Sequence, residues 1–143
     1  MTATLTNPAL TEPSSSHARP IARTAAIAGA AAAVATTAVG SIAEAAEVPL
    51  VVGGMDIQLP AFALFTFVGA ALGGLIASQL RKRSTQPRRA FLLATAALTV
   101  LSVIPDVAGD ATTATKLTLI GAHVLAAAMI IPALARRLPT TKG

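Results

Sequence analysis

The chain has 143 residues and a net charge of +5; 54% of its residues are hydrophobic, only 12% are charged, and its mean hydropathy is +0.70. A soluble domain carries about 25% charged residues, and the apolar residues here form blocks, so the composition predicts an integral membrane protein. Cysteine is absent, which excludes thiolate catalysis and thiol redox chemistry. The basic residues flank apolar blocks and form no face with aromatics, so nucleic acid is not an expected partner.

Residues 1–20 contain three prolines and a serine triplet with little apolar content. Such a segment cannot bury enough apolar surface to fold, so we predict a disordered tail on the cytoplasmic side, in which His17 is simply solvated. Residues 21–138 are expected to form one transmembrane domain, followed by a short C-terminal tail at 139–143.

Four apolar blocks follow the tail, and a membrane-spanning helix needs about 20 predominantly apolar residues. Pro60 suits the first turn of the second helix, and Asp110 is the predicted N-cap of the fourth. We therefore predict an all-α fold, an integral membrane four-helix bundle. The expected helices cover about residues 24–43, 60–80, 90–106 and 115–135.

The charged residues indicate how the helices are oriented. Ten of the eleven basic residues lie near the termini or between the second and third blocks, whereas five of the six acidic residues lie in the other two connections. The positive-inside rule then predicts a multi-pass protein of the plasma membrane with both termini in the cytoplasm.

A second interpretation of the first block stays open. Arg19 and Arg23, an alanine-rich core and the small residues Ala43–Ala45 also fit a cleaved signal peptide. The long polar leader and an apolar core of about 20 residues favour a retained helix.

Small residues repeat every fourth position in the first two blocks. Gly69, Gly73 and Ala77 extend a GxxxG motif in the second block, and positions 25, 29 and 33 of the first block have the same spacing. Small residues let helix backbones approach closely in lipid. The pattern favours packing between helices one and two of the same chain; the alternative is a homo-oligomer formed through either helix.

Polar residues follow one face of the third helix. Thr95, Thr99, Ser102 and Asp106 are separated by steps of four, three and four, which keeps them on one side. Counted from the basic residues at the helix ends, Asp106 and His123 differ in height by about one helical turn. A hydrogen bond between them, direct or through water, is therefore feasible.

His123, Asp106 and Ser102 form the candidate polar site, with Glu44 and Thr99 as secondary candidates. An ionisable residue inside the bilayer is a functional candidate, and an imidazole beside a carboxylate can shuttle protons or act as a general base. The alternative is a neutral His123 that bonds a helix carbonyl and stabilises the bundle. The spacing matches no metal-ligand pattern, so we expect neither a metal nor a cofactor.

The pattern "SVIPD" at 102–106, a histidine in the fourth helix and "IPALARR" at 131–137 resemble a family of uncharacterised four-helix membrane proteins from actinobacteria, known chiefly as a domain of unknown function. The resemblance covers about residues 21–138. It implies the same four-helix architecture and no activity. The matching positions are Ser102, Pro105, Asp106, His123 and Pro132.

The sequence thus favours a small structural or accessory membrane protein whose main partner is the lipid bilayer, and not an enzyme. Two alternatives remain. One is a proton-coupled carrier, and the other is a membrane enzyme that acts on a lipid-like substrate with a His123/Asp106 acid–base pair.

Overall fold

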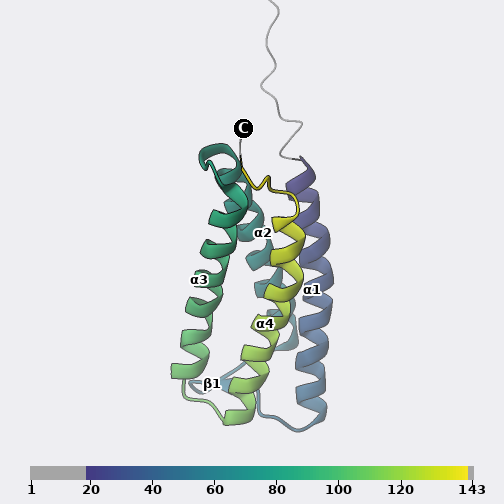
Figure 1. Cartoon of the computed structure of the whole chain (residues 1–143). Helices are drawn as coiled ribbons and strands as arrows, with labels where there is room; N and C mark the ends of the chain where they lie inside the picture. Colours follow the sequence, from purple (N-terminus) through teal and green to yellow (C-terminus); the bar gives the residue numbers. More distant parts are fainter. Residues whose placement is uncertain (1–18, 142–143) are drawn as a thin grey trace, which may run out of the picture.

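The computed structural model describes residues 19–141, and within this range four helices and one short β-hairpin are joined by short connections (Figure 1). The structure confirms the prediction of an all-α fold with four helices, each long and apolar enough to cross a membrane. The predicted state of His17 lies outside the described residues. The helices are α1 (Arg19–Ala45), α2 (Leu59–Arg83), α3 (Pro87–Ala108) and α4 (Thr113–Ala135); the strands are β1 (Val51–Val52) and β2 (Met55–Asp56).

The helices extend beyond the apolar blocks into charged sequence. α1 begins at Arg19 rather than near residue 24, and α3 begins at Pro87 rather than near residue 90. Hydropathy marks only the part of a helix that can lie in lipid, whereas backbone hydrogen bonding continues through residues such as Arg and Lys that favour helices. α2 accordingly ends in Arg81–Arg83, where cations interact favourably with the negative end of the helix dipole.

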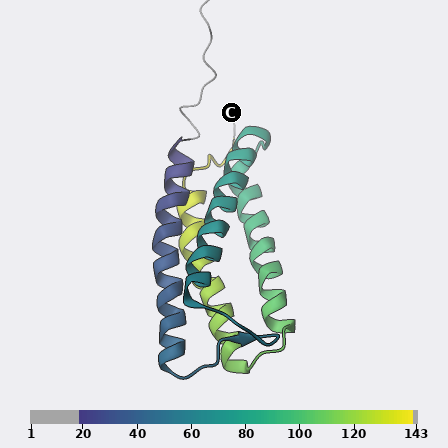
Figure 2. The same cartoon turned by 180° about the vertical axis from the view of Figure 1, so that it is seen from behind.

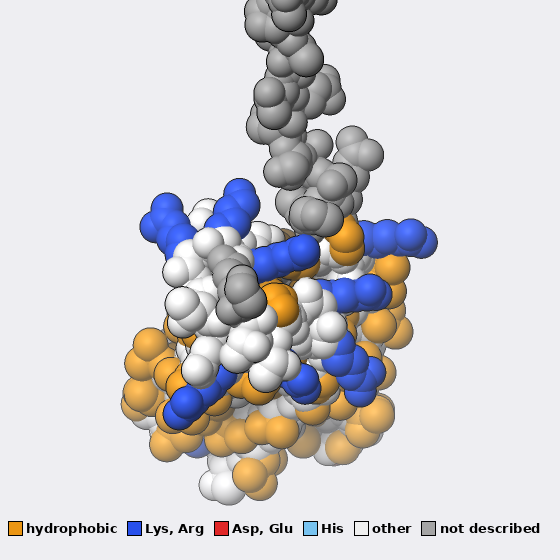
Figure 3. Space-filling view, turned by 45° about the horizontal axis from the view of Figure 1, so that its top comes forward, with side chains coloured by type: hydrophobic (Ala, Val, Ile, Leu, Met, Phe, Trp, Pro, Cys, Tyr) orange, Lys and Arg blue, Asp and Glu red, His pale blue; other side chains and the backbone are white. Residues whose placement is uncertain are grey.

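The helices run side by side, so the molecule has two distinct ends (Figures 1 and 2). One end holds the helix termini rich in Lys and Arg, and Figure 3 shows these side chains spread over it. We call it the basic end, defined by Arg23, Arg81, Lys82, Arg83, Arg88, Arg89, Arg136 and Arg137. The opposite end, the hairpin end, consists of the β1–β2 hairpin and the connection between α3 and α4.

Thr112, and not Asp110, caps α4. The Thr112 side chain accepts a hydrogen bond from the backbone N–H of Thr115 at 3.2 Å, and the helix starts at the next residue, Thr113. The prediction that Asp110 is the N-cap was therefore wrong. Asp110 lies in the connection instead, where its backbone carbonyl accepts a hydrogen bond from the N–H of Gly53 at 2.9 Å.

The β-hairpin folds over the connection between α3 and α4. Gly53 and Gly54 at its tip have φ values of 57° and 77°, the left-handed conformation that a two-residue type I′ turn requires. The Thr115 hydroxyl donates to the carbonyl of Pro49, just before β1. Val52 lies so close to Gly109 that a Cβ at Gly109 would be 3.0 Å from Val52 Cγ1. The two connections at this end therefore form one packed unit.

Small residues allow α1 and α2 to approach closely. A Cβ added at Gly29 of α1 would lie 2.6 Å from the Cβ of Ala70, and one added at Gly74 of α2 would lie 2.8 Å from the Cβ of Ala25. Ala70 is almost completely buried. The small residues of α1 thus face Ala70 and Gly74 of the same chain.

The GxxxG positions of α2 lie beside this contact. A Cβ at Gly73 would meet Leu134 Cδ1 of α4 at 3.2 Å, and Ala77 is fully buried. Gly69 has open space around it. Two of the three positions therefore pack within the chain, and the homo-oligomer through them stays a prediction.

α3 is the least buried helix. Its buried residues are Pro87, Phe91 and Thr95, all in the half nearer the basic end. Towards the hairpin end, large apolar side chains such as Leu98 and Leu101 are exposed. This half of α3 does not fill the space between itself and the other helices.

Candidate functional site

A cavity of about 650 Å³ lies between α2, α3 and α4. We call it the three-helix cavity. Its volume falls within the roughly 300–1,000 Å³ that is usual for sites that bind small molecules. Most of its wall is apolar, with Phe62, Phe65 and Leu72 from α2, Phe91 and Leu98 from α3, and Ala122 and Ile130 from α4.

The polar face of α3 lines one side of this cavity. The Thr95 hydroxyl donates to the carbonyl of Phe91, Thr99 donates to Thr95 O, and Ser102 donates to Thr99 O, each at 2.8 Å. A hydroxyl has one proton and two lone pairs. Because each proton is bonded to the helix backbone, these side chains present acceptor lone pairs to the cavity.

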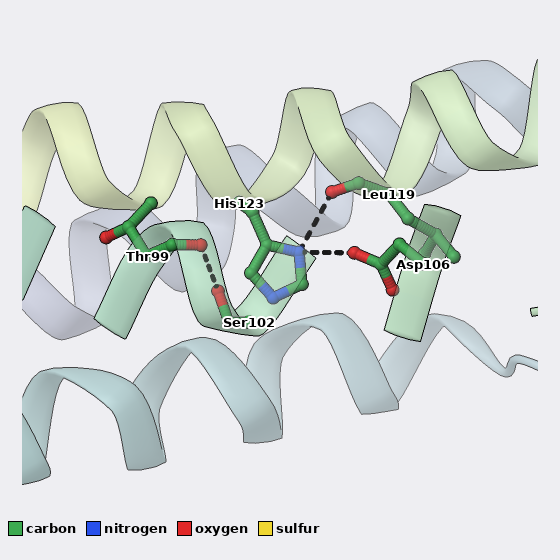
Figure 4. A network of polar contacts seen from close by, with 5 residues as sticks. All are labelled: Thr99, Ser102, Asp106, Leu119 and His123. Carbon is green, nitrogen blue, oxygen red and sulfur yellow. Dashed lines mark hydrogen bonds and ion pairs between the residues drawn. The ribbon is translucent and has the colours of Figure 1, made fainter. Parts of the chain in front are cut away.

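Asp106 and His123 lie together at the end of this polar face. Nδ1 of His123 is 3.0 Å from Oδ2 of Asp106 and 3.1 Å from the carbonyl oxygen of Leu119 (Figure 4). Both side chains line the three-helix cavity, and the imidazole is 40% exposed against 15% for the Asp106 carboxyl group. Two residues 17 positions apart in the sequence are thus brought into contact by the antiparallel packing of α3 and α4.

The contact leaves one carboxylate oxygen without a hydrogen bond. Oδ2 of Asp106 is buried, and although Nδ1 of His123 is near, no donor points at it with hydrogen-bond geometry. The N–H at Nδ1 is instead donated to the carbonyl of Leu119, one turn earlier on α4. Oδ2 has almost no accessible surface, so the exposed 15% of this side chain, which a bound molecule could reach, belongs to its other atoms.

The carbonyl and carboxylate around Nδ1 also fix the chemistry of the ring. In the neutral imidazole, a proton on Nδ1 leaves Nε2 as an acceptor. Such a nitrogen can accept a proton or a hydrogen bond from a molecule in the cavity. Ser102 is not an activated nucleophile, because its proton is donated to Thr99 O and not to His123.

The hairpin covers one end of the cavity. Val52 of β1 and Ile57, just after β2, both contribute to its wall. Between α2 and α3 the wall is formed by side chains that are themselves exposed: Phe65 is 72% exposed, Leu72 is 55% exposed and Leu98 is 47% exposed. The cavity therefore opens sideways between these two helices, at a surface that lipid chains cover when the helices span a membrane.

The chain matches one known family. Residues 16–140 match DUF6069, a family of unknown function. The chain belongs to this family. No curated protein and no solved structure matches it. Membership of a family of unknown function and four spanning helices together describe a small membrane protein of unknown activity.

Of the two secondary candidates from the sequence, one lines the cavity and the other does not. Thr99 lies on the polar face of α3 and lines the three-helix cavity. Glu44 is exposed near the end of α1 and lies outside the cavity wall. Across residues 19–141, no three His, Asp or Glu side chains come together to hold a metal ion.

Sequence reasoning missed the polar contact between α1 and α2. The hydroxyls of Thr36 in α1 and Thr66 in α2 are 2.9 Å apart, and Thr36 is buried. The Thr36 hydroxyl also lies 3.2 Å from the carbonyl oxygen of Ala33, and either threonine can be the donor in the contact between Thr36 and Thr66. A signal was present, since Thr36 and Thr37 form a polar pair in the middle of a predominantly apolar block. Sequence alone does not tell which of the two faces α2.

Proposed function

We propose that this protein is a small accessory membrane protein that binds one amphipathic, lipid-like molecule in the three-helix cavity. The observation that carries the proposal is an apolar cavity with an ionisable pair, Asp106 and His123, at one end. An apolar wall favours a hydrocarbon chain, and a small number of polar groups fixes the orientation of the bound molecule. The sideways opening lets such a molecule arrive from the bilayer.

Binding fits the cavity better than transport or catalysis does. Towards the basic end its wall consists of apolar side chains such as Ile76, Phe91 and Ile131, so no polar path continues to that end. A carrier for protons or ions needs polar groups along the path. An acyl-transfer enzyme needs an activated nucleophile, and the Ser102 hydroxyl is bonded to its own helix.

The same proposal includes the setting of the protein. The clustering of basic residues at one end supports a four-helix bundle with both termini in the cytoplasm, by the positive-inside rule. The plasma membrane is the proposed location. An actinobacterial source and a retained first helix stay predictions from the sequence.

Two glycines provide a matched test. Gly69 and Gly121 both lie in helices with nothing within 4 Å of an added Cβ, but only Gly69 lines the cavity. Gly69→Leu should therefore add bulk at the cavity wall with a Cβ that meets no neighbour, whereas Gly121→Leu adds the same side chain elsewhere. Both variants are purified in a mild detergent, and native mass spectrometry measures the lipid-like molecules that remain bound.

We expect wild type and Gly121→Leu to retain one bound molecule and Gly69→Leu to lose it. The melting temperature of each variant in detergent shows whether it is folded. Equal retention by two folded variants would place the bound molecule outside the cavity and contradict the proposal. The proposal is also contradicted if wild type retains no molecule and binds no added amphiphile with a dodecyl chain.

A further inference from the structure

The polar groups of the three-helix cavity offer mainly hydrogen-bond acceptors. Its polar side chains are Thr66, Thr95, Thr99, Ser102, Asp106 and His123. The protons of the three α3 hydroxyls are bonded to backbone carbonyls, and the Thr66 hydroxyl is hydrogen-bonded with that of Thr36. No Lys or Arg is present among the lining residues of the described chain.

The two groups at the end of the polar face strengthen this bias. The ionised carboxylate of Asp106 only accepts hydrogen bonds, and this side chain lines the cavity with 15% of its surface exposed. Nδ1 of His123 faces two acceptor oxygens, which leaves Nε2 as an acceptor in the neutral ring. A bound head group therefore meets a carboxylate, an imidazole nitrogen and the lone pairs of Ser102.

From this inventory we infer that the bound molecule is an amphiphile with a protonated primary amine as its head group, whose N–H donors bond the acceptors around Asp106. This inference rests on the proposed function and adds the chemistry of the ligand. An ammonium group has three donors and no acceptor, and its charge is opposite to that of the carboxylate. The hydrocarbon chain lies along the apolar wall towards Phe91 and Ile130.

Head groups that lack either the positive charge or the N–H donors of a primary ammonium group fit poorly. A carboxylate or sulfate head would place acceptors against acceptors and a negative charge against Asp106. A quaternary ammonium has the right charge but no N–H, so it cannot donate a hydrogen bond to the carboxylate. An alcohol can donate one hydrogen bond to the carboxylate, but it lacks the opposite charge and the further donors of an ammonium group.

Four probes with the same hydrocarbon chain separate these cases. The full chain in a mild detergent is offered an equimolar mixture of dodecylammonium, dodecanol, dodecyltrimethylammonium and dodecanoate, and native mass spectrometry measures which is bound. We expect dodecylammonium to bind about tenfold or more tightly than dodecyltrimethylammonium and dodecanoate, with dodecanol between them.

Asp106→Asn and Asp110→Asn form the matched pair of variants. Asp110 is exposed and outside the cavity wall, so Asp110→Asn should keep the preference for dodecylammonium, whereas Asp106→Asn should reduce it about tenfold. The comparison of the four probes on wild type needs no variant, so it tests the inference even if Asp106→Asn does not fold.

The outcomes separate this inference from the proposed function. Equal binding of all four probes, abolished by Gly69→Leu, would overturn the amine head group and leave the proposed function intact. Preference for dodecanoate, or equal binding of the primary and quaternary amines, would overturn it as well. Binding that Gly69→Leu does not change would contradict both.

The ammonium group has two sources, a free long-chain amine or an aminophospholipid. Didodecanoyl phosphatidylethanolamine carries the same ammonium next to a phosphate. If this phospholipid binds more weakly than dodecylammonium, the site is assigned to a single-chain amine. If the two bind equally tightly, it is assigned to the phospholipid. Either result supports an amine head group.

Discussion

Gly29→Ala should destabilise the protein although alanine is the better helix former. The added Cβ would lie 2.6 Å from the Cβ of Ala70, whereas carbon atoms in favourable contact are about 3.5–4.0 Å apart. The two helices would have to separate by roughly 1 Å along a contact that also includes Gly74 and Ala25. Overpacking of this kind costs about 1–3 kcal/mol, against a gain of about 1 kcal/mol from helix propensity.

The compensating change tests whether the clash is the cause. In the double variant Gly29→Ala, Ala70→Gly the small residue moves from α1 to α2, so the clash disappears and the two propensity changes cancel. We expect its stability to return close to that of wild type. The free energy of unfolding is measured in mixed detergent micelles for both single variants and the double variant, and the coupling should be about 1–3 kcal/mol.

Gly121→Ala is the control, because nothing lies within 4 Å of its added Cβ. It should be as stable as wild type or up to about 1 kcal/mol more stable. If Gly29→Ala is as stable as Gly121→Ala, or if the double variant shows no coupling, then α1 and α2 do not make this contact and the reasoning fails.

Other positions test different parts of the fold by the same unfolding measurement. Phe91→Ala removes a fully buried ring and should cost about 3–5 kcal/mol, whereas Leu93→Ala, at an exposed position of the same helix, should cost far less; similar losses would refute the burial of α3. Thr36→Val should cost about 0.5–1.5 kcal/mol by breaking the contact with α2, and no loss would argue against it. Thr112→Ala should cost about 0.5–2 kcal/mol and Asp110→Ala less, and the reverse order would restore Asp110 as the cap.

Much of the architecture could be predicted from local sequence. Four apolar blocks of sufficient length predict four spanning helices, because a chain in lipid must satisfy its backbone hydrogen bonds internally. Asp106 and His123 stand out for a similar reason, since an ionisable group is rare in an apolar block. Capping was harder to predict, because Asp110 and Thr112 are both good N-cap residues. The choice between them depends on the hairpin, which bonds the backbone of Asp110 and the hydroxyl of Thr115.

The sequence by itself determined the number of helices, the segregation of charge between the two ends and the polar face of α3. These features follow from composition and from the helical repeat, which act along the chain. Only the tertiary structure decided that Gly74 rather than Gly73 faces α1, that Thr36 rather than Thr37 bonds α2, and that a cavity remains beside α3. The physical reason is that these features depend on how each helix is rotated about its axis. Packing between helices sets that rotation, and in a sequence so rich in alanine several rotations present equally small residues.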